Sequence, residues 1–585
     1  MVMFSYRIII FLFSFVLANY SLPTRYNLEA DMLRAQTPGW PSKGYVDLRS
    51  GSGGSFFVGT FNGLGKIDAL PFNLSESLIE DNLYKITDSN LPEGGNPVVK
   101  TYPLDGGEVL IVVSGILTVP DPNNRCGDPP DSFCQKGTGI AWSTDSGVNW
   151  NYIDQSESAS GVEYPCEIDQ NVTCYEAEWN GIAYDHGVYR GLYGDYRVTN
   201  VTWDVAADID YEYIYAASWY GLLKRFKYTD SDPQWEPVPL PNDSDFSLSC
   251  DNFPPQENYY YGAAFDDIEG IIPTTYNHRP FSVEIIDGDI WVGGSGVNRG
   301  EILGESCINW TRHTANSTFQ TFDHYDFALG SDWVVGIHAQ KLEEGNRIWT
   351  INWVDPPAAH HLSYTEDNGQ TWRREKYFSN LGSLKAIVYN LYSFDSTPND
   401  GIDEHDILYA STEKGLFKFE GLNNWVKEEI ATDEIFDEIG ISNENSSSFS
   451  VRTAAVDQNN NLLVGTTDGL IVKDLLGQFY YPEYVDAILA GNNNNLLVYP
   501  NPFIVDDENH ATFIVESSNN GKLEIYDFSM SKVANGECNY VDQTLECTWN
   551  GLSDRGDRVA NGIYFCKLHT NERVYWEKLG VVRRK

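Results

Sequence analysis

The chain has 585 residues, which is too long for one ordinary compact domain but fits a repeat architecture joined to a smaller domain. Aromatic residues make up 14% of it, and 50 Gly stand against only 4 Met, a profile that favours many short strands and turns over packed helices. The formal charge of −45 argues against a general affinity for nucleic acid or anionic membranes, because such a surface repels phosphate groups.

The first eighteen residues predict an export signal. Arg7 precedes an apolar run from Ile8 to Leu17, and Val16 and Ala18 stand three and one residues before the expected cut. The run is too short for a comfortable membrane span. We therefore expect a signal peptide at 1–18 and a mature chain without a transmembrane segment, exported through the periplasm and secreted or held at the cell surface.

Residues 45–480 repeat one pattern: an apolar strand that ends in a small pair, a short polar turn with Gly, and a second alternating strand. Examples are "SFFVGTFNGLGKID" from Ser55, "ILYASTEKGLFKFE" from Ile407 and "NLLVGTTDGLIVKD" from Asn461. Seven such β-hairpins can be counted, which predicts an all-β fold and a β-propeller of seven blades, with six or eight left open. The repeats resemble those of secreted bacterial propellers of the two-component-regulator type.

Two eight-residue stretches within this region share a skeleton, "STDSGVNW" at 143–150 and "TEDNGQTW" at 365–372. A hydroxyl and an Asp that fold back onto backbone N–H groups, followed by Gly and Trp, predict a tight turn between two strands. This eight-residue motif resembles the Asp-box, S-x-D-x-G-x-x-W, of bacterial sialidases, sortilin-type receptors and photosystem assembly propellers, where it is a folding element. We expect both copies at equivalent hairpins on one rim; their residues are Ser143, Asp145, Gly147, Trp150, Thr365, Asp367, Gly369 and Trp372.

The nine cysteines are consistent with export to an oxidising compartment, where disulfides form. Two pairs with equal spacing predict small disulfide-bonded loops, and a third pair predicts a longer link: Cys126 with Cys134, Cys166 with Cys174, and Cys250 with Cys307. The trio Cys538, Cys547 and Cys566 leaves one thiol free.

No catalytic motif stands out, and catalysis is left open with a non-catalytic role favoured. The sialidase resemblance implies an early F/Y-R-I-P string, but the nearest match, "YRVT" at 196–199, lacks the Pro. Histidines gather at His313, His324, His338, His360 and His361, which predicts packing roles more strongly than a metal or general-base site. The sequence predicts no cofactor and no metal site; calcium is the one ion that the oxygen-rich stretches 121–131 and 208–213 would suit, although neither has EF-hand spacing.

The character of the chain changes at an Asn-rich linker, 481–496, and short alternating strands then predict a small β-sandwich at 497–585. "YPNPF" and "TWNGLSDRGDRVANGIYFCKL" resemble the FlgD-type immunoglobulin-like domain of the C-terminal secretion and sorting kind, although Ser553 and Asp554 are shifted against the usual acidic place. The resemblance implies export through a type IX-like machinery. The residues that carry it are Pro500, Asn501, Pro502, Phe503, Trp549, Gly551, Gly556, Gly562 and Tyr564.

The leading functional hypothesis is a secreted or cell-surface propeller that works as a binding module, delivered by its C-terminal domain to a type IX-like secretion machinery. A glycan or a protein is the expected ligand at the propeller face, and no nucleic acid partner is expected. Two alternatives remain: an extracellular glycan-active enzyme, a hydrolase or lyase with a propeller pocket, and a structural component of a surface or secretion assembly.

Overall fold

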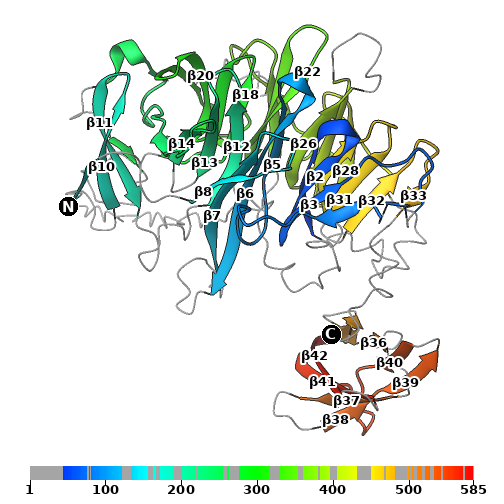
Figure 1. Cartoon of the computed structure of the whole chain (residues 1–585). Coiled ribbons are helices and arrows are strands. Elements are labelled where there is room, and N and C mark those ends of the chain that lie inside the picture. The colour runs from blue at the N-terminus through cyan, green and yellow to red at the C-terminus, as the bar shows by residue number, and fades with distance from the viewer. Residues whose placement is uncertain are drawn as a thin grey trace, which may run out of the picture.

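The structure is a computed structural model of the chain, and it is built almost entirely of β-strands joined by turns (Figure 1). It describes residues 44–583 apart from 76–77, 80, 121–132, 156–161, 166–171, 190–200, 219–221, 255–259, 263–275, 316–327, 354–359, 380–381, 396–404, 431–449, 467–468, 481–496, 500–502, 506–509, 517–520, 528–531, 542–543 and 571–573. Within these ranges no helix has the length and apolar character needed to span a bilayer. The predicted signal peptide, 1–18, and the linker, 481–496, lie outside the described residues.

Seven antiparallel sheets, named R1 to R7 here, occupy the region from Tyr45 to Tyr480. The first four are R1 (β1 Tyr45–Ser50, β2 Phe56–Thr60, β3 Gly63–Ile67, β4 Leu83–Lys85), R2 (β5 Val99–Pro103, β6 Val109–Pro120, β7 Phe133–Ser143, β8 Asn151–Ile153), R3 (β12 Thr202–Asp208, β13 Tyr213–Ser218, β14 Leu222–Lys227, β15 Glu236–Pro237) and R4 (β18 Ser282–Ile286, β19 Asp289–Gly294, β20 Gly296–Gly304, β21 Cys307–His313, with β16 Ser247–Leu248 on its outer edge). The other three are R5 (β22 Trp333–Lys341, β23 Asn346–Trp353, β24 His360–Thr365, β25 Arg373–Glu375), R6 (β26 Val388–Phe394, β27 Ile407–Thr412, β28 Gly415–Gly421, β29 Asn424–Lys427) and R7 (β30 Val451–Val456, β31 Leu462–Thr466, β32 Gly469–Lys473, β33 Phe479–Tyr480).

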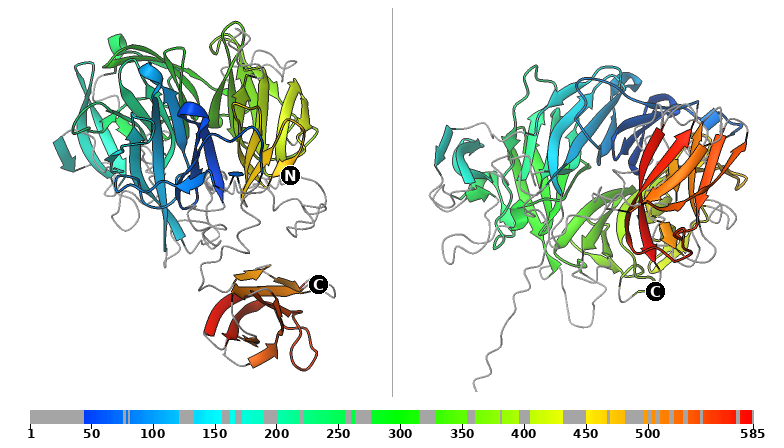
Figure 2. Two further views of the ribbon diagram at one scale, coloured as in Figure 1. Left: turned by 45° about the vertical axis from the view of Figure 1, so that its right-hand side comes forward. Right: turned by 90° about the horizontal axis from the view of Figure 1, so that it is seen from below.

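These sheets follow one another in a closed, propeller-like ring. The first strand of each sheet packs against the next sheet in the order β1, β5, β12, β18, β22, β26 and β30, and β30 packs against β1 again. Among the described strands, R7 and R1 share none by hydrogen bonding, because β30–β33 and β1–β4 form separate sheets. Side-chain packing therefore closes the ring, and Figure 2 shows the sheets from two further directions.

The small pair near the end of most second strands has a packing reason; R5 has Ile351 and Asn352 at these positions. A Cβ on Gly59 would lie 2.1 Å from the Asn96 carbonyl oxygen, one on Gly293 would lie 2.8 Å from Val334, and one on Gly465 would lie 2.7 Å from the Tyr45 side chain. In each case the clashing residue belongs to the next sheet or to the segment that leads into it. The repeated small residue thus sets how closely neighbouring sheets approach.

Polar side chains on the first strands also link neighbouring sheets. β1 and β12 each carry an irregular register step just before an aspartate, Asp47 and Asp204. Asp47 accepts a hydrogen bond from the backbone N–H of Val99 in R2 (3.3 Å), and Asp204 accepts bonds from the Ser282 hydroxyl (2.8 Å) and the Val283 N–H (3.2 Å) in R4. These buried carboxylates satisfy backbone donors at the irregular steps and join consecutive sheets.

One sheet that the sequence analysis did not anticipate lies outside the ring. It contains β9 Val162–Pro165, β10 Val172–Trp179 and β11 Ile182–Tyr189, with β17 Tyr260–Gly262 added in parallel to β11. Its hairpin packs on R3, where the Tyr184 hydroxyl donates to the Pro237 carbonyl (3.2 Å) and the Arg225 guanidinium lies 5.2 Å from the Trp179 ring centre. Figures 1 and 2 show β10 and β11 at the outer edge of the molecule.

The residues after the linker form two sheets around their own core. One sheet has the order β34 (Leu497–Tyr499), β36 (Ala511–Glu516), β40 (Thr544–Trp549) and β39 (Glu537–Val541). The other has the order β35 (Phe503–Val505), β42 (Val574–Arg583), β41 (Gly562–Thr570), β37 (Gly521–Tyr526) and β38 (Lys532–Asn535). Both contribute to a single buried cluster, which includes Phe503, Leu545 and Leu568.

Two disulfides are present among the described cysteines. Cys250 is bonded to Cys307 at the outer edge of R4, and Cys538 is bonded to Cys547 across β39 and β40. Cys566 is buried and free. The two predicted small loops lie outside the described residues, since Cys126 and Cys166 are not described and neither are the side chains of Cys134 and Cys174.

Candidate functional site: a polar cavity on the ring axis

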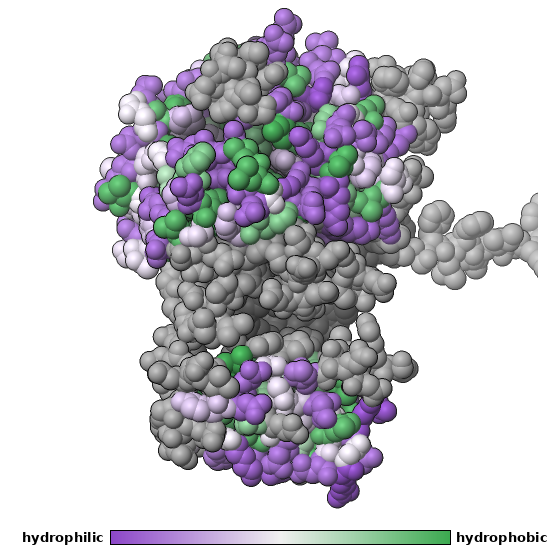
Figure 3. Space-filling model, turned by 90° about the vertical axis from the view of Figure 1, so that its right-hand side faces the viewer, coloured by the Kyte–Doolittle hydropathy of each residue, from purple (hydrophilic) through white to green (hydrophobic). Residues whose placement is uncertain are grey.

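A cavity of about 680 Å³ lies where the first strands of the ring sheets converge. It is lined by residues of all seven first strands, and its lining is mixed in character, with charged, aromatic and aliphatic side chains. Cavities of roughly 300 to 1,000 Å³ are typical of small-molecule sites. On the face seen in Figure 3, the coloured residues are mostly hydrophilic, with hydrophobic residues scattered among them.

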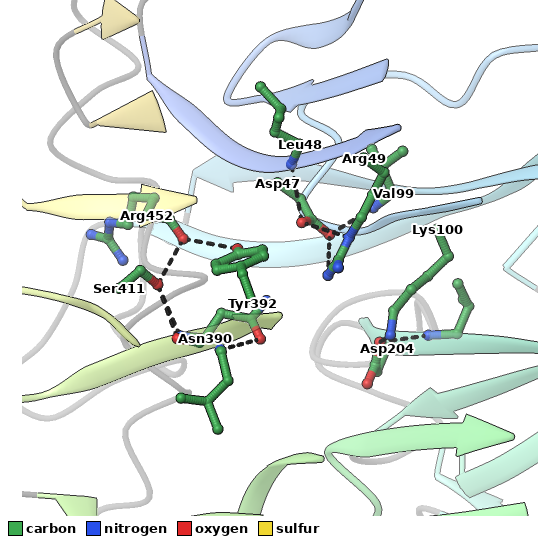
Figure 4. Close-up of polar contacts among 12 residues, drawn as sticks. Asp47, Leu48, Arg49, Val99, Lys100, Asp204, Asn390, Tyr392, Ser411 and Arg452 are labelled. Carbon is green, nitrogen blue, oxygen red and sulfur yellow. Dashed lines mark hydrogen bonds and ion pairs between the residues drawn. The ribbon is translucent and has the colours of Figure 1, made fainter. Parts of the chain in front are cut away.

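One wall of the cavity holds a buried cation between two carboxylates. The Lys100 ammonium lies 2.6 Å from Glu284 Oε2 and 3.6 Å from Asp204 Oδ1. Burial lowers the pKa of Lys100, but Asp204 and Glu284 outweigh it, and the pKa is raised above its ordinary value. Lys100 therefore stays charged at neutral pH. Figure 4 shows Lys100 beside Asp204.

A second cation lies on another wall, on β1. Arg49 forms an ion pair with Asp47, with Nε 3.1 Å from Oδ1, and its guanidinium carbon lies 5.3 Å from the centre of the Tyr392 ring. Burial opposes the charge of Arg49, yet Asp47 and the other neighbouring groups raise its pKa above the ordinary value. Tyr392 is itself fixed by its hydroxyl, which donates to the Arg452 carbonyl at 3.1 Å (Figure 4).

A hydroxyl held between two imidazoles completes the wall. Ser393 Oγ lies 2.9 Å from His338 Nε2 and 3.0 Å from His405 Nδ1. Because a serine has one proton to donate, it donates to one ring and accepts from the other, which fixes the two tautomers relative to each other. Burial, together with Arg49 and Lys100, holds the pKa of His338 well below its usual range, so this ring is neutral at neutral pH.

Several of these groups occupy one level of the ring. In R1, R4, R5 and R6, one residue of the first strand pairs with the small residue of the second strand or with the residue at the equivalent position. Two residues after this paired position, the first strands carry Arg49, Glu284, His338 and Tyr392. Since each first strand enters its sheet in the same direction, an equal register step places these side chains at a similar depth. The arrangement brings together donors and acceptors that lie as far apart in the sequence as β1 and β26.

The repeated turns of the sequence analysis lie away from this cavity. Each connects the third and fourth strands of its sheet, β7 to β8 in R2 and β24 to β25 in R5. Asp145 Oδ1 accepts from the Ser143 hydroxyl and the Asn149 N–H (both 2.8 Å), and Asp367 Oδ1 accepts from the Thr365 hydroxyl and the Thr371 N–H at the same distances.

The rest of the two turns matches as well. Gly147 and Gly369 have φ near 89°, the left-handed region that favours glycine. Trp150 packs near Phe57 of R1, and Trp372 packs near Trp291 of R4, in both cases on the second strand of the preceding sheet. The two turns have the same geometry, and they brace neighbouring sheets.

The described residues of the C-terminal motif form a structural cluster. Trp549 Nε1 donates to the Leu552 carbonyl (2.8 Å), and the Trp549 ring lies 6.0 Å from Phe503 and 5.7 Å from Tyr564 between ring centres. Gly551 and Gly556 have positive φ at the intervening turns, and Gly562 begins β41. Pro500, Asn501 and Pro502 lie outside the described residues.

Of the five histidines singled out from the sequence, the three whose side chains the structure describes lie in different places. His313 packs beside Trp372, and His361 lies near Arg374; burial is the first cause that lowers the pKa of each to about 4. Of the five, the structure places His338 in the cavity. His324 and the side chain of His360 are not described.

Metal binding gains no support from the described residues, among which no group of three or more His, Cys, Asp or Glu is placed to hold an ion. Asp208, in one of the oxygen-rich stretches, uses Oδ1 to accept from the N–H groups of Asp210 (3.1 Å) and Tyr211 (3.2 Å). The Asp208 carboxylate therefore stabilises the turn that follows β12. The other stretch, 121–131, lies outside the described residues.

Sequence reasoning missed most of the cavity. Its polar wall consists of Arg49, Lys100, Asp204, Glu284, Tyr392, Ser393 and His405, and none of them was singled out. A signal was available, because strands such as "YVDLRS", "TWDVAAD" and "SVEII" carry a charged residue within an otherwise apolar first strand. A buried charge is the informative exception in such a strand.

Comparison with known proteins does not assign the chain to a family. No family model matches it, and no curated protein matches its sequence significantly. Among solved structures it is similar to PorZ, described as an essential surface component of the type IX secretion system of Porphyromonas gingivalis, with 13% identity and a TM-score of 0.32 over 91% of this chain and 64% of that one. It is also similar to the extracellular domain of the putative one-component system BT4673 from B. thetaiotaomicron (10% identity, TM-score 0.20, 92% of this chain and 87% of that one) and to Sqt1 from Chaetomium thermophilum (9%, 0.34, 77% and 97%). At these TM-scores the likeness carries no argument about function.

Proposed function

We propose that this protein is an extracellular binding module whose ligand site is the axial cavity. The observation that carries the proposal is the cavity itself: about 680 Å³, walled by seven strands and furnished with buried charges that a purely structural channel does not need. Burying a charge is costly unless it is paired, and the cations Arg49 and Lys100 are each held by a carboxylate. Groups positioned in this way are suited to hold a small molecule.

The scaffold that we propose for this site is a seven-bladed propeller. The cyclic contact order of R1 to R7 supports seven blades, and the matching geometry of the turns at 143–150 and 365–372 supports their interpretation as Asp-boxes. Both turns occupy the outer hairpin of a blade, so their role in the proposal is to brace neighbouring blades. The binding role belongs to the axis.

Delivery is proposed to rest on the two ends of the chain. The residues 1–18 would direct export, and the two-sheet domain at 497–585 would serve as a FlgD-like address for a type IX-like machinery, as its motif resemblance implies. The packing of Trp549 against Phe503 and Tyr564 supports the interpretation that the motif specifies the fold of this domain. The domain has its own core and takes no part in the cavity.

A ligand screen tests the binding site. Saturation-transfer NMR with a panel of neutral, cationic and anionic small molecules would be run on the full chain and on Ser50→Trp, since Ser50 is exposed and lines one end of the cavity. The matched control is Ser231→Trp, in the exposed turn between β14 and β15. We expect compounds that bind the wild type and Ser231→Trp but not Ser50→Trp. A panel in which nothing binds, or in which Ser50→Trp binds as well as the wild type, contradicts the proposal.

A further inference from the structure

We infer that the axial cavity selects an uncharged, polyhydroxylated ligand of the sugar class over its charged analogues. The inference rests on the proposed function, because it names the chemistry of the ligand that the same cavity would bind. It follows from two properties of the walls: the cations Arg49 and Lys100 are already paired with carboxylates, and several polar groups retain hydrogen-bonding capacity.

Two cations of the cavity are compensated directly. Arg49 lies within 3.1 Å of Asp47, and Lys100 lies within 2.6 Å of Glu284 and 3.6 Å of Asp204. The third cation, Arg452, lies with its guanidinium carbon 4.0 Å from the centre of the Tyr389 ring. Asp395 and Asp457 also line the cavity, and the Asp457 carboxylate accepts from the N–H groups of Asn459 and Asn461 (both 2.8 Å).

An ionic ligand would have to disturb these pairs. A carboxylate that approached Arg49 or Lys100 would compete with a protein carboxylate already in contact, and it would add an uncompensated negative charge to a largely buried space. An ammonium group that approached Glu284 would meet Lys100 at the same oxygen pair. Both kinds of charged ligand therefore pay a desolvation cost that the cavity does not offset.

An uncharged ligand with several hydroxyls meets no such obstacle. Within the part of the chain that the structure describes, the hydrogen bond of Glu284 to Lys100 uses Oε2 and leaves Oε1 available, and Lys100 has two further N–H donors. Arg49 donates to Asp47 through Nη2 and carries donors on Nη1 as well. Ser393, placed between two imidazoles, adds a spare lone pair.

The spatial order of these groups suits vicinal hydroxyls. Arg49, Glu284 and His338 stand at equivalent positions on their first strands, and they supply a donor, an acceptor and a neutral imidazole. Hydrogen bonds to charged groups are stronger than those between neutral groups, so paired ions bind hydroxyls well without attracting net charge. A sugar presents hydroxyls around its ring as both donors and acceptors.

The test compares neutral sugars with charged analogues of the same size. Isothermal titration of the full chain would use glucose, galactose, mannose and their disaccharides, with glucuronic acid and glucosamine as the charged counterparts. We expect saturable binding of at least one neutral sugar and binding of its charged counterparts about tenfold weaker or more. Ser50→Trp should abolish this binding.

Two variants probe the charge compensation directly. Glu284→Gln leaves Lys100 without its closest partner, so we expect the neutral sugar to bind about tenfold more weakly and the preference over glucuronic acid to shrink or invert. Its control is Glu428→Gln, because Glu428 pairs with Lys473 at the same distance, 2.6 Å, with equal exposure, 19%, but outside the cavity. Ser393→Ala removes no charge, so it should weaken binding of the neutral sugar without changing the preference for the neutral sugar over glucuronic acid. This variant replaces Glu284→Gln in the test if Glu284→Gln does not fold.

The outcomes separate the inference from the proposed function. Charged compounds that bind the axis of the wild type more tightly than neutral sugars would overturn the inference while the binding site stands. Glu284→Gln and Glu428→Gln with the same selectivity would overturn it as well. If no compound of any charge binds at the axis, the proposed function falls together with it.

Discussion

Single polar residues on the first strands connect the fold to the candidate site. Asp47 and Asp204 accept backbone or side-chain hydrogen bonds from a neighbouring sheet, and each also faces a cation in the cavity. Their structural role explains why such charges are buried at all, since they satisfy donors at the irregular register steps. Arg49 and Lys100 pair with these carboxylates, and Lys100 also pairs with Glu284, so the functional proposal rests on the hydrogen-bonding groups that these pairs leave over.

The aspartate of each repeated turn gives a prediction at the same scale. Asp367→Asn should lower the free energy of unfolding by about 1–2 kcal/mol at pH 7, because hydrogen bonds from Thr371 and Thr365 to the charged carboxylate are lost or weakened. The control Asp230→Asn, in the corresponding turn of R3, should change it by less than about 0.5 kcal/mol. Urea unfolding at pH 7 measures both, and equal losses in the two variants would contradict the assignment.

The same variant has a defined pH dependence. Burial raises the pKa of Asp367, but hydrogen bonds from Thr371 and Thr365 outweigh it, and the folded-state pKa is lowered below 3.8. A lowered pKa contributes stability above the unfolded value, and that stability is lost as the pH falls through the folded value. The difference between wild type and Asp367→Asn should therefore hold at pH 7 and shrink below about pH 3.8; a difference that grows in acid would contradict the account.

At the scale of elements, the sequence predicted the hairpins well and their partners poorly. The strands from Ser55, Ile407 and Asn461 correspond to β2–β3, β27–β28 and β31–β32, because the small pair and the Gly-containing turn constrain the chain locally. The sheet of β9, β10, β11 and β17 was missed. Its antiparallel hairpin β10–β11 turns through Asn180 and Gly181, both with positive φ, so a local signal for that part was available in the sequence. The addition of β17 depends on a parallel pairing between segments about 75 residues apart, which local patterns do not encode.

The packing role of the small pair can be tested within one strand. Gly293→Ala should destabilise the protein by about 1–3 kcal/mol, because its Cβ would lie 2.8 Å from Val334 of the next sheet. Gly294→Ala is the control, since the nearest atom to its Cβ is 3.2 Å away and other sheets have Thr or Ser at this position, and we expect about 0.5 kcal/mol or less. Thermal unfolding of both variants measures the two losses of stability. A larger loss of stability for Gly294→Ala than for Gly293→Ala would refute the packing argument.

The disulfides make a second prediction about elements. Removing the Cys250–Cys307 bond with a double Cys→Ser variant should cost about 4 kcal/mol, because it opens a loop of 57 residues in the unfolded chain. Removing Cys538–Cys547, with a separation of 9, should cost about 2.5 kcal/mol. Differential scanning calorimetry should show the first loss in the ring and the second in the C-terminal domain; a shift of the same transition by both would contradict this.

At the scale of the whole molecule, we propose a closed ring that binds a ligand and a C-terminal domain that directs export. The ring closes by packing between β30 and β1, and its core and that of the two-sheet domain are distinct clusters. The sequence allowed a propeller with a second small domain to be predicted, because repeats and a change of composition are visible along the chain. It did not reveal the axial site, since residues that converge there come from every sheet and only ring closure brings them together.

Removal of the tail tests this division. A chain that ends at residue 496 should keep the calorimetric transition of the ring and its ligand binding, and in the native host it should remain inside the cell envelope. Residues 497–585 fused to an exported reporter should carry the reporter to the exterior. A truncated protein that still reaches the exterior, or a ring that unfolds without the tail, would assign a structural role to the domain instead.

The most direct test of the central claim is a crystal structure of the protein with the neutral sugar that binds most tightly. The account predicts density for the sugar on the ring axis, with its hydroxyls within hydrogen-bond distance of Arg49, Lys100 and Glu284, and with the Arg49–Asp47 and Lys100–Glu284 pairs intact. A sugar bound on the outer surface, with the axial cavity filled only by water, would contradict it.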